Sequence, residues 1–139
     1  LLALFLVWLL TDGFWHQLTA IMAAGAIGLA VVVIIIKFAI KRRRPEGQWG
    51  AIYRNTDPHS FPSGHAARTA MLATVAILSG PAWLAILLSV WAPLVSLARV
   101  WMGVHYVSDV VVGILVGILA GLAVAGISPW LISTFPAIF

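Results

Sequence analysis

Residues 18–36 read LTAIMAAGAIGLAVVVIII, a run without one charged side chain. A helix needs about 20 apolar residues to cross the hydrocarbon core of a bilayer, which is roughly 30 Å thick. Two more uncharged runs follow at residues 69–98 and 110–139. These three runs predict most of the membrane spans of the chain.

The composition of the 139 residues indicates a membrane protein and excludes an ordinary soluble domain. Hydrophobic residues make up 63% of the chain and charged residues only 9%, whereas a soluble domain needs far more charge to cover its surface. The sequence has no cysteine, so disulfides, thiolate ligands and thiol nucleophiles are excluded. We expect the basic residues of so apolar a chain to bind anionic groups at a membrane surface, not nucleic acid.

The apolar runs and the turn signals between them predict an all-α transmembrane helical bundle, a single integral-membrane domain over residues 1–139. Tight breaks are expected at Gly80-Pro81 and Ser128-Pro129. Gly113, Gly117 and Gly121 recur every four residues, a spacing that lets a neighbouring helix pack closely. We expect five firm spans, and a sixth in the full protein because the first run starts inside a helix and lacks the features of a signal peptide. The expected helices are Leu1–Leu10, Leu18–Ile40, Ser63–Ser79, Ala82–Ala98 and Asp109–Gly126.

Helices that run up and down place residues 37–65 and 99–109 at one membrane face. That face, or its immediate neighbourhood, holds all the positive side chains of a chain whose formal net charge is +4. We therefore expect the functional site at this face. The positive residues are Lys37, Lys41, Arg42, Arg43, Arg44, Arg54, Arg68 and Arg99.

Lys37, Lys41 and Arg44 form the first of three polar clusters at this face. Beyond its membrane part, Leu18–Ile40, the second helix is expected to run on through the basic stretch and stop near Pro45, because the residue before a proline leaves the α region. A seven-residue spacing then puts Lys37 and Arg44 on one side of the helix, two turns and roughly 10 Å apart. The same cluster is also typical of a basic flank that touches anionic lipid headgroups.

The second cluster is Pro62-Ser63-Gly64-His65, which opens the next helix. Serine is a good helix cap, glycine lets another group approach the backbone, and the free N–H groups of a helix start bind anions. His65 then faces the bound anion. The alternative is a plain capped helix with an interfacial histidine.

The third cluster is Arg99, His105 and Asp109. If the helix begins by about residue 105, the four-residue spacing puts His105 and Asp109 on one face. The carboxylate then accepts a hydrogen bond from one imidazole nitrogen and leaves the other free to attack. The alternative is a pair that only satisfies the hydrogen bonds of its own two side chains. Charged residues beside membrane spans are costly, however, and this favours a functional role for the pair.

Together the clusters contain the parts that phosphoryl transfer needs. Lys37, Arg44 and Arg99 can hold the phosphate oxygens, and the planar fork of arginine suits them bidentately. Ser63 and the backbone N–H groups of Gly64 and His65 add neutral donors. Positioning and charge stabilisation of this kind do most of the work in this class of reaction.

The imidazoles of the second and third clusters supply the reacting groups. His105 is the expected nucleophile, oriented by Asp109, and His65 is the expected general acid for the departing alkoxide. No group of Asp, Glu or His has the ligand count of a Mg²⁺ or Zn²⁺ site. We therefore expect neither a metal nor a cofactor.

The three clusters resemble, in order and internal spacing, the signature motifs of the type-2 phosphatidic acid phosphatase superfamily. The resemblance implies an all-helical bundle and a phosphohistidine intermediate. By position, His105 is similar to the family nucleophile, Asp109 to its orienting carboxylate and His65 to its general acid. Ala98 stands where the family usually has serine, so one hydrogen bond of the pocket is lost. The residues that resemble the family's phosphate-binding set are Lys37, Arg44, Ser63, Gly64 and Arg99.

The resemblance implies a metal-independent lipid phosphatase of the cell membrane and leaves its substrate open. Prenyl phosphates or diphosphates, phosphatidic acid, phosphatidylglycerol phosphate and a lipid A phosphate present similar heads. The aromatic residues beside the second motif are placed to select among them, or form an interfacial belt; they are Trp49, Tyr53, His59 and Phe61. His16, on the opposite face, is expected to be structural.

Three other functions fit parts of the pattern. A lipid-to-lipid phosphotransferase would use the same intermediate, and a vanadate-dependent haloperoxidase would use the same pocket. A non-catalytic protein that binds anionic lipids would need only the basic cluster. The excess of Lys and Arg places this face in the cytoplasm, but functional charge weakens that rule, so the membrane side and the oligomeric state stay open.

Overall fold

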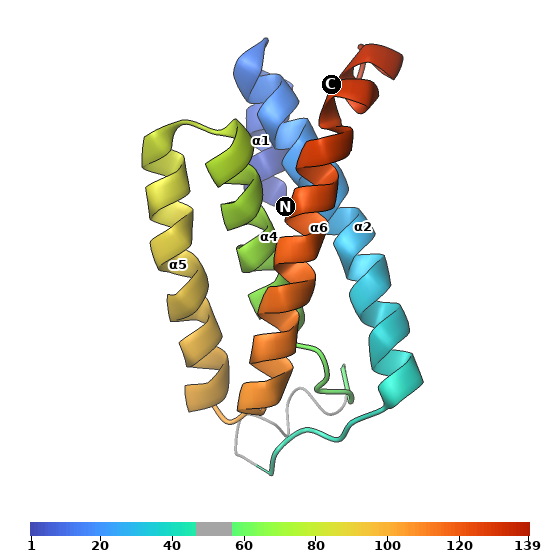
Figure 1. The fold of residues 1–139 in the computed structure, drawn as a ribbon, viewed down its shortest axis with the longest axis vertical. Helices are drawn as coiled ribbons and strands as arrows, with labels where there is room; N and C mark the ends of the chain where they lie inside the picture. The colour runs from blue at the N-terminus through green and yellow to red at the C-terminus, as the bar shows by residue number, and fades with distance from the viewer. Residues whose placement is uncertain (47–56) are drawn as a thin grey trace.

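Four long helices lie side by side in the computed structural model, with a short helix packed at one end (Figure 1). The structure describes residues 1–46 and 57–139. Within these ranges the pairing of Arg43 with His59 is the one isolated β-bridge, and the all-α fold is confirmed. The helices are α1 (Leu2–Leu10), α2 (Phe14–Ile40), α4 (Gly64–Ser79), α5 (Ala82–Trp101) and α6 (Val107–Thr134).

Three of these helices, α2, α5 and α6, are long and apolar enough to cross a membrane. The expected five spans are therefore not confirmed. Helix α1 has only 9 residues and α4 has 16. At 1.5 Å per residue α4 is about 24 Å long, less than the roughly 30 Å of a bilayer core.

Helix α4 is the centre of the bundle and packs against α6, α5 and α2. Its buried side is built from small residues, which let three neighbours approach one short helix closely. Ser63 caps its start, as expected, with a side-chain oxygen that accepts from the backbone N–H of Ala66. The buried alanines of α4 are Ala66, Ala67, Ala70, Ala73 and Ala76.

The glycine ridge of α6 packs against α4, as its spacing predicts. A Cβ atom added to Gly113 would lie 2.6 Å from the carbonyl oxygen of Ser63, and one added to Gly117 would lie 2.1 Å from that of Ala67. Both distances are much shorter than a normal van der Waals contact. The two helices therefore meet backbone to backbone, with no side chain between them at these positions.

Helix α2 differs from the prediction at both ends. It begins at Phe14, and it ends at Ile40 instead of continuing to near Pro45. Lys41 adopts a left-handed conformation, with φ 52° and ψ 34°, and its N–H donates to the carbonyl of Lys37. A run of four cations at 41–44 would bring like charges together on one more helical turn, which disfavours it. Arg44 is therefore not on the helix, and the expected shared helix side with Lys37 is wrong.

Helix α6 was expected to break at Ser128-Pro129 but continues through the proline to Thr134. Proline has no N–H to donate to the carbonyl four residues back, which here is that of Ala125. The hydroxyl of Ser128 donates to this same oxygen at 2.8 Å. The side chain thus replaces the missing backbone donor, which is how a proline is tolerated inside an apolar helix.

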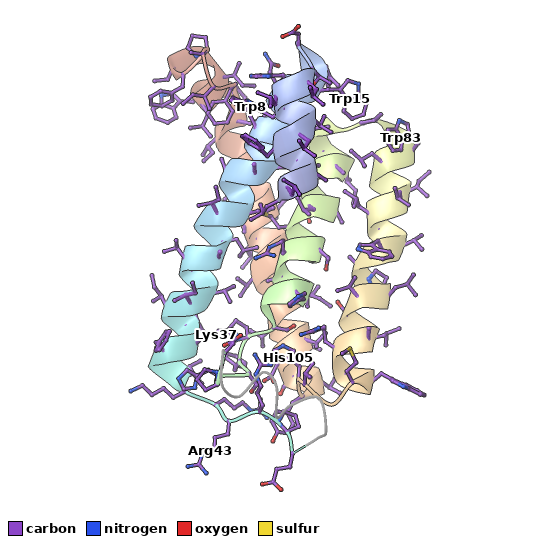
Figure 2. All side chains as sticks on the ribbon, turned by 180° about the vertical axis from the view of Figure 1, so that it is seen from behind. Trp8, Trp15, Lys37, Arg43, Trp83 and His105 are labelled. Carbon is purple, nitrogen blue, oxygen red and sulfur yellow. The ribbon has the colours of Figure 1, made fainter. Side chains whose placement is uncertain are left out.

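The two ends of the bundle differ in chemistry (Figure 2). Trp8, Trp15 and Trp83 lie at one end, where the indole N–H of Trp8 donates to the carbonyl of Ile138. Lys37 and His105 lie at the other end. Trp101, the last residue of α5, also lies at the cationic end. Tryptophan at both ends and an excess of cations at one end are typical of the two interfaces of a membrane protein.

Replacing Gly117 with alanine should destabilise the bundle by about 1–3 kcal/mol, because the new methyl group meets the backbone of α4 and overpacks the contact. Gly126→Ala is the matched control in the same helix, since a Cβ there has nothing within 4 Å among the described residues. The measurement is the thermal midpoint of unfolding in detergent. Equal midpoints for the two variants would contradict the close approach of α4 and α6.

Candidate active site

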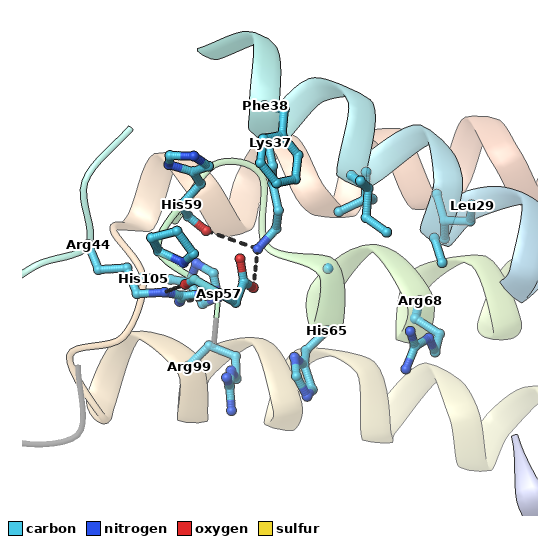
Figure 3. A pocket seen from close by; sticks show the side chains of 15 residues that line it. Leu29, Lys37, Phe38, Arg44, Asp57, His59, His65, Arg68, Arg99 and His105 are labelled. Carbon is cyan, nitrogen blue, oxygen red and sulfur yellow. Dashed lines mark hydrogen bonds and ion pairs between the residues drawn. The ribbon is translucent and has the colours of Figure 1, made fainter. Parts of the chain in front are cut away.

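A cavity of about 410 Å³ lies at the cationic end of the bundle. It is bounded by α2, the segment before α4, the first turns of α4, the end of α5 and the connection to α6 (Figure 3). The two imidazoles predicted to act together, His65 and His105, line this one cavity. The predicted site residues that line it are Lys37, Arg44, Gly64, His65, Arg99 and His105.

Lys37 and Arg44 are held by a third residue, Asp57, that the sequence analysis did not select. The carboxylate of Asp57 accepts from the ammonium of Lys37 and, at 2.8 Å, from Nη2 of Arg44. Lys37 also donates to the carbonyl of His59 at 2.9 Å. Because these contacts come from the loop after α2 and the segment before α4, they bring the two cations together without a shared helix.

Arg44 makes the contact that ties the first cluster to the third. Its Nη1 donates to the carbonyl of Val104 at 2.9 Å and lies 3.3 Å from Nε2 of His105. A guanidinium has only donors, so this contact leaves the lone pair of Nε2 facing Arg44. This contact assigns the proton of a neutral His105 to Nδ1.

Nδ1 of His105 faces Asp109 but has no hydrogen-bond partner among the described residues, so the expected hydrogen bond between the two side chains is not formed. The distance from His105 Nδ1 to Asp109 Oδ2 is 3.7 Å, an ion-pair separation longer than a hydrogen bond. His105 precedes α6, which begins at Val107, so the predicted helical face shared by His105 and Asp109 is wrong. The two residues are neighbours because the carboxylate turns back over the start of the helix.

Asp109 is fully buried and fixed by other donors. Its carboxylate accepts from the backbone N–H of Tyr106 at 2.9 Å and from Nη1 of Arg42 at 2.9 Å. Arg42 also lies over the ring of Tyr106, 4.2 Å from its centroid. Arg42 is thus a charge partner of Asp109 that the sequence analysis treated only as part of the basic run.

The environment of His105 keeps it neutral. Burial, followed by the positive charges of Arg44, Arg99 and Lys37, lowers the pKa of His105 from 6.5 to about 3. The side chain is almost completely buried. An imidazole without a proton on Nε2 at neutral pH has the form that a nucleophile requires.

Ser63 and Gly64 occupy different positions relative to the cavity. Ser63 is fully buried, its hydroxyl caps α4, and its N–H donates to the carbonyl of Asp109 at 2.9 Å. Gly64 lines the cavity. The serine therefore joins α4 to α6, while the backbone of the glycine faces the space where an anion would bind.

His65, Arg68 and Arg99 extend the site along α4 and α5. Figure 3 shows their three side chains pointing the same way. Arg68 also lines the cavity, and its buried Nε has no hydrogen-bond partner among the described residues. The sequence analysis missed Arg68, although an arginine one turn after His65 in an otherwise uncharged helix was a usable signal.

Only some of the aromatic residues expected to select the substrate belong to the described part of the chain. His59 lines the cavity, with its ring edge-on to Phe38 at 5.4 Å between centroids. Trp49 and Tyr53 lie outside the described residues. At the other end of the molecule, Nδ1 of His16 lies 2.8 Å from the carbonyl of Trp8, a contact that fits the expected structural role.

Comparisons with known proteins identify a family and two kinds of relative. The family model of the PAP2 superfamily matches residues 13–133. The decaprenylphosphoryl-5-phosphoribose phosphatase of Mycobacterium tuberculosis is 37% identical over 99 residues, which are 70% of this chain and 54% of that protein. The undecaprenyl-diphosphatase of Sulfolobus acidocaldarius is 44% identical over 59 residues, 42% of this chain and 29% of that protein. The chain thus spans about half the length of the mycobacterial relative and less than a third of the archaeal one. No solved structure matches it.

The lowered pKa of His105 predicts a specific loss of stability in acid. Between about pH 6.5 and pH 3 the unfolded chain binds a proton at His105 that the folded protein does not, so stability falls as the pH falls. His105→Gln removes this contribution. Between about pH 7 and pH 5 the wild type should lose on the order of 1–2 kcal/mol more than the variant. Thermal midpoints in detergent at the two pH values measure the difference, and parallel losses would contradict a buried neutral His105.

Proposed function

The chain belongs to the PAP2 superfamily, and on this premise we propose that it hydrolyses a prenyl-type lipid phosphate through a phosphohistidine intermediate. The observation that carries the proposal is the 3.3 Å contact between Nη1 of Arg44 and Nε2 of His105 at the cavity. A phosphate bound by this guanidinium would have its phosphorus atom within reach of the nitrogen that carries the lone pair.

The shape of the cavity supports a lipid as the phosphate carrier. Lys37, Arg44 and Arg99 are among the residues that line the cavity, and apolar side chains of α2 line it as well. A phosphate head and a hydrocarbon chain would each meet a matching surface there. The apolar wall consists of Leu29, Ala30, Val33 and Ile34.

In the first step Nε2 of His105 attacks phosphorus in line with the lipid oxygen. The N–P bond forms as the P–O bond to the lipid breaks, and His65 gives a proton to the departing oxygen. Burial and the nearby arginines lower the pKa of His65 to about 4 in the free protein, and the negative charge of the bound phosphate would raise it. Asp109 stabilises the positive charge that develops on His105, because it faces the proton-bearing Nδ1. The cations hold the three remaining phosphoryl oxygens.

In the second step water attacks the phosphohistidine. His65, now without its proton, accepts one from the water, the N–P bond breaks, and inorganic phosphate leaves. His105 returns to the neutral form, which its burial and the neighbouring positive charges favour. The site is then ready for another lipid.

Arg68 supports a substrate with two phosphoryl groups. The names of both relatives describe such compounds, a phosphoribose linked to a decaprenylphosphoryl group and a diphosphate. Arg68 lies three residues, about 4.5 Å along the axis of α4, beyond His65. We assign it to the phosphoryl group that stays with the lipid, while Lys37, Arg44 and Arg99 hold the one that is transferred.

Replacing His105 with alanine should abolish phosphate release from undecaprenyl diphosphate, because no other group carries the intermediate. When the lipid is labelled at its terminal phosphate, the wild-type protein should become covalently labelled. This label should be stable in base and lost in acid, as expected for a phosphohistidine. His16→Gln, at the other end of the bundle, should label and turn over normally. Turnover by the alanine variant, or passage of the label to a second lipid instead of to water, would contradict the proposal.

Replacing Arg68 with glutamine should lower kcat/KM for undecaprenyl diphosphate by about 10- to 100-fold, the effect of losing one charged hydrogen bond. Activity on undecaprenyl monophosphate should change much less, because that lipid lacks the second group. Arg43→Gln is the control, since Arg43 is an exposed cation at the same end and is not among the residues that line the cavity. Equal losses on both lipids would contradict the assignment of Arg68.

A further inference from the structure

The carboxylate of Asp57 is placed inside the anion site. One of its oxygens, Oδ2, accepts from both Lys37 and Arg44, and the backbone carbonyl of Asp57 accepts from Nε of the same arginine at 2.7 Å. The side chain of Lys37 is 9% exposed and that of Arg44 is 1% exposed, whereas that of Asp57 is 42% exposed. Two nearly buried cations therefore share one oxygen of a partly exposed side chain that lines the cavity (Figure 3).

This oxygen stands where a phosphoryl oxygen would bind. Nη2 of Arg44 donates to Asp57, while Nη1 of the same planar group lies 3.3 Å from Nε2 of His105. A phosphate that is in line with Nε2 and held by this fork would need the donor that Asp57 now takes. The carboxylate and the phosphate therefore compete for the same two cations.

We propose that Asp57 is a specificity residue: its carboxylate fills the phosphate site in the resting protein, and only a ligand with more negative charge than a carboxylate displaces it efficiently. The inference rests on the proposed function and concerns which lipid heads this same site admits. When a phosphodiester, with its single negative charge, displaces the carboxylate of Asp57, the charge beside Lys37 and Arg44 is unchanged. Exchanging it for a phosphomonoester, with a charge of about −1.5 to −2, adds Coulomb attraction.

The position of the site explains why such selection matters. The cations lie at the end of the bundle where lipid headgroups would be, and bulk phospholipids are phosphodiesters. An open pair of buried cations would be attractive to those anionic heads. With Asp57 in place, a phosphodiester gains nothing by entry, and the displaced carboxylate, already 42% exposed, returns to water only when a stronger anion arrives.

A different role is also chemically reasonable: Asp57 could hold Lys37 and Arg44 in place while the phosphate binds beside it. The two roles predict opposite results for Asp57→Asn, which keeps the size of the side chain and removes its charge. If Asp57 competes, the variant binds anions more tightly. If Asp57 positions the cations, the variant binds anions more weakly and loses turnover.

The test compares wild type, Asp57→Asn and Glu46→Gln in two measurements. The first is the rise in thermal midpoint in detergent on titration with inorganic phosphate, which needs no turnover. The second is hydrolysis of undecaprenyl diphosphate in phosphatidylcholine vesicles with increasing phosphatidylglycerol. Glu46 is the control because it is exposed, belongs to the same end of the molecule and is not among the residues that line the cavity.

For Asp57→Asn we expect half-saturation at about tenfold lower phosphate and strong inhibition by phosphatidylglycerol, against little inhibition of the wild type and of Glu46→Gln. Unchanged or weaker phosphate binding by Asp57→Asn would overturn the proposal and assign Asp57 to positioning. If that variant does not fold, Asp57→Ser, which is smaller and equally neutral, replaces it in both measurements, and the same outcomes are expected. Absence of lipid hydrolysis by the wild type would contradict the proposed function, while the phosphate titration would still decide the role of Asp57.

Discussion

The positive charges buried at one end of an apolar bundle are the constraint on which the rest of the structure depends. Lys37, Arg44 and Arg99 are almost completely buried, and a buried cation is tolerated only with acceptors around it. Three carbonyl groups from two separate segments and the carboxylate of Asp57 surround Lys37 and Arg44. The loops at this end are therefore folded inward around charge, and the cavity is the space that this arrangement leaves.

The sequence predicted the membrane character, the all-α fold and the residues that gather around the cavity better than it predicted their geometry. Long apolar runs and a four-residue glycine spacing are local patterns, so they could be recognised without coordinates. Arg44 shows the limit, because its distance from Lys37 is set by a tertiary ion pair and not by helical periodicity. The same holds for His105, which reaches Asp109 from outside the helix.

The residues that the sequence analysis missed share a physical reason. Asp57 and Arg42 matter through partners far along the chain, Arg44 for the first and Asp109 for the second. Loop composition cannot show which charges will meet. The continuation of α6 through Pro129 escaped prediction for a related reason, since the hydroxyl of Ser128 compensates locally for a residue that normally ends a helix.

The close contact between α4 and α6 has a mechanical consequence for the whole bundle. At Gly113 and Gly117 the nearest atoms of α4 belong to the polypeptide backbone, which has no alternative rotamers to absorb an extra methyl group. A bulky side chain at Gly117 would displace one entire helix relative to the other. Gly117 lies eight residues from Asp109, about 12 Å along the axis, yet such a displacement would be transmitted rigidly to the reacting groups. Mutational sensitivity in this protein should follow the contact between the two helices, not the distance of a residue from the cavity.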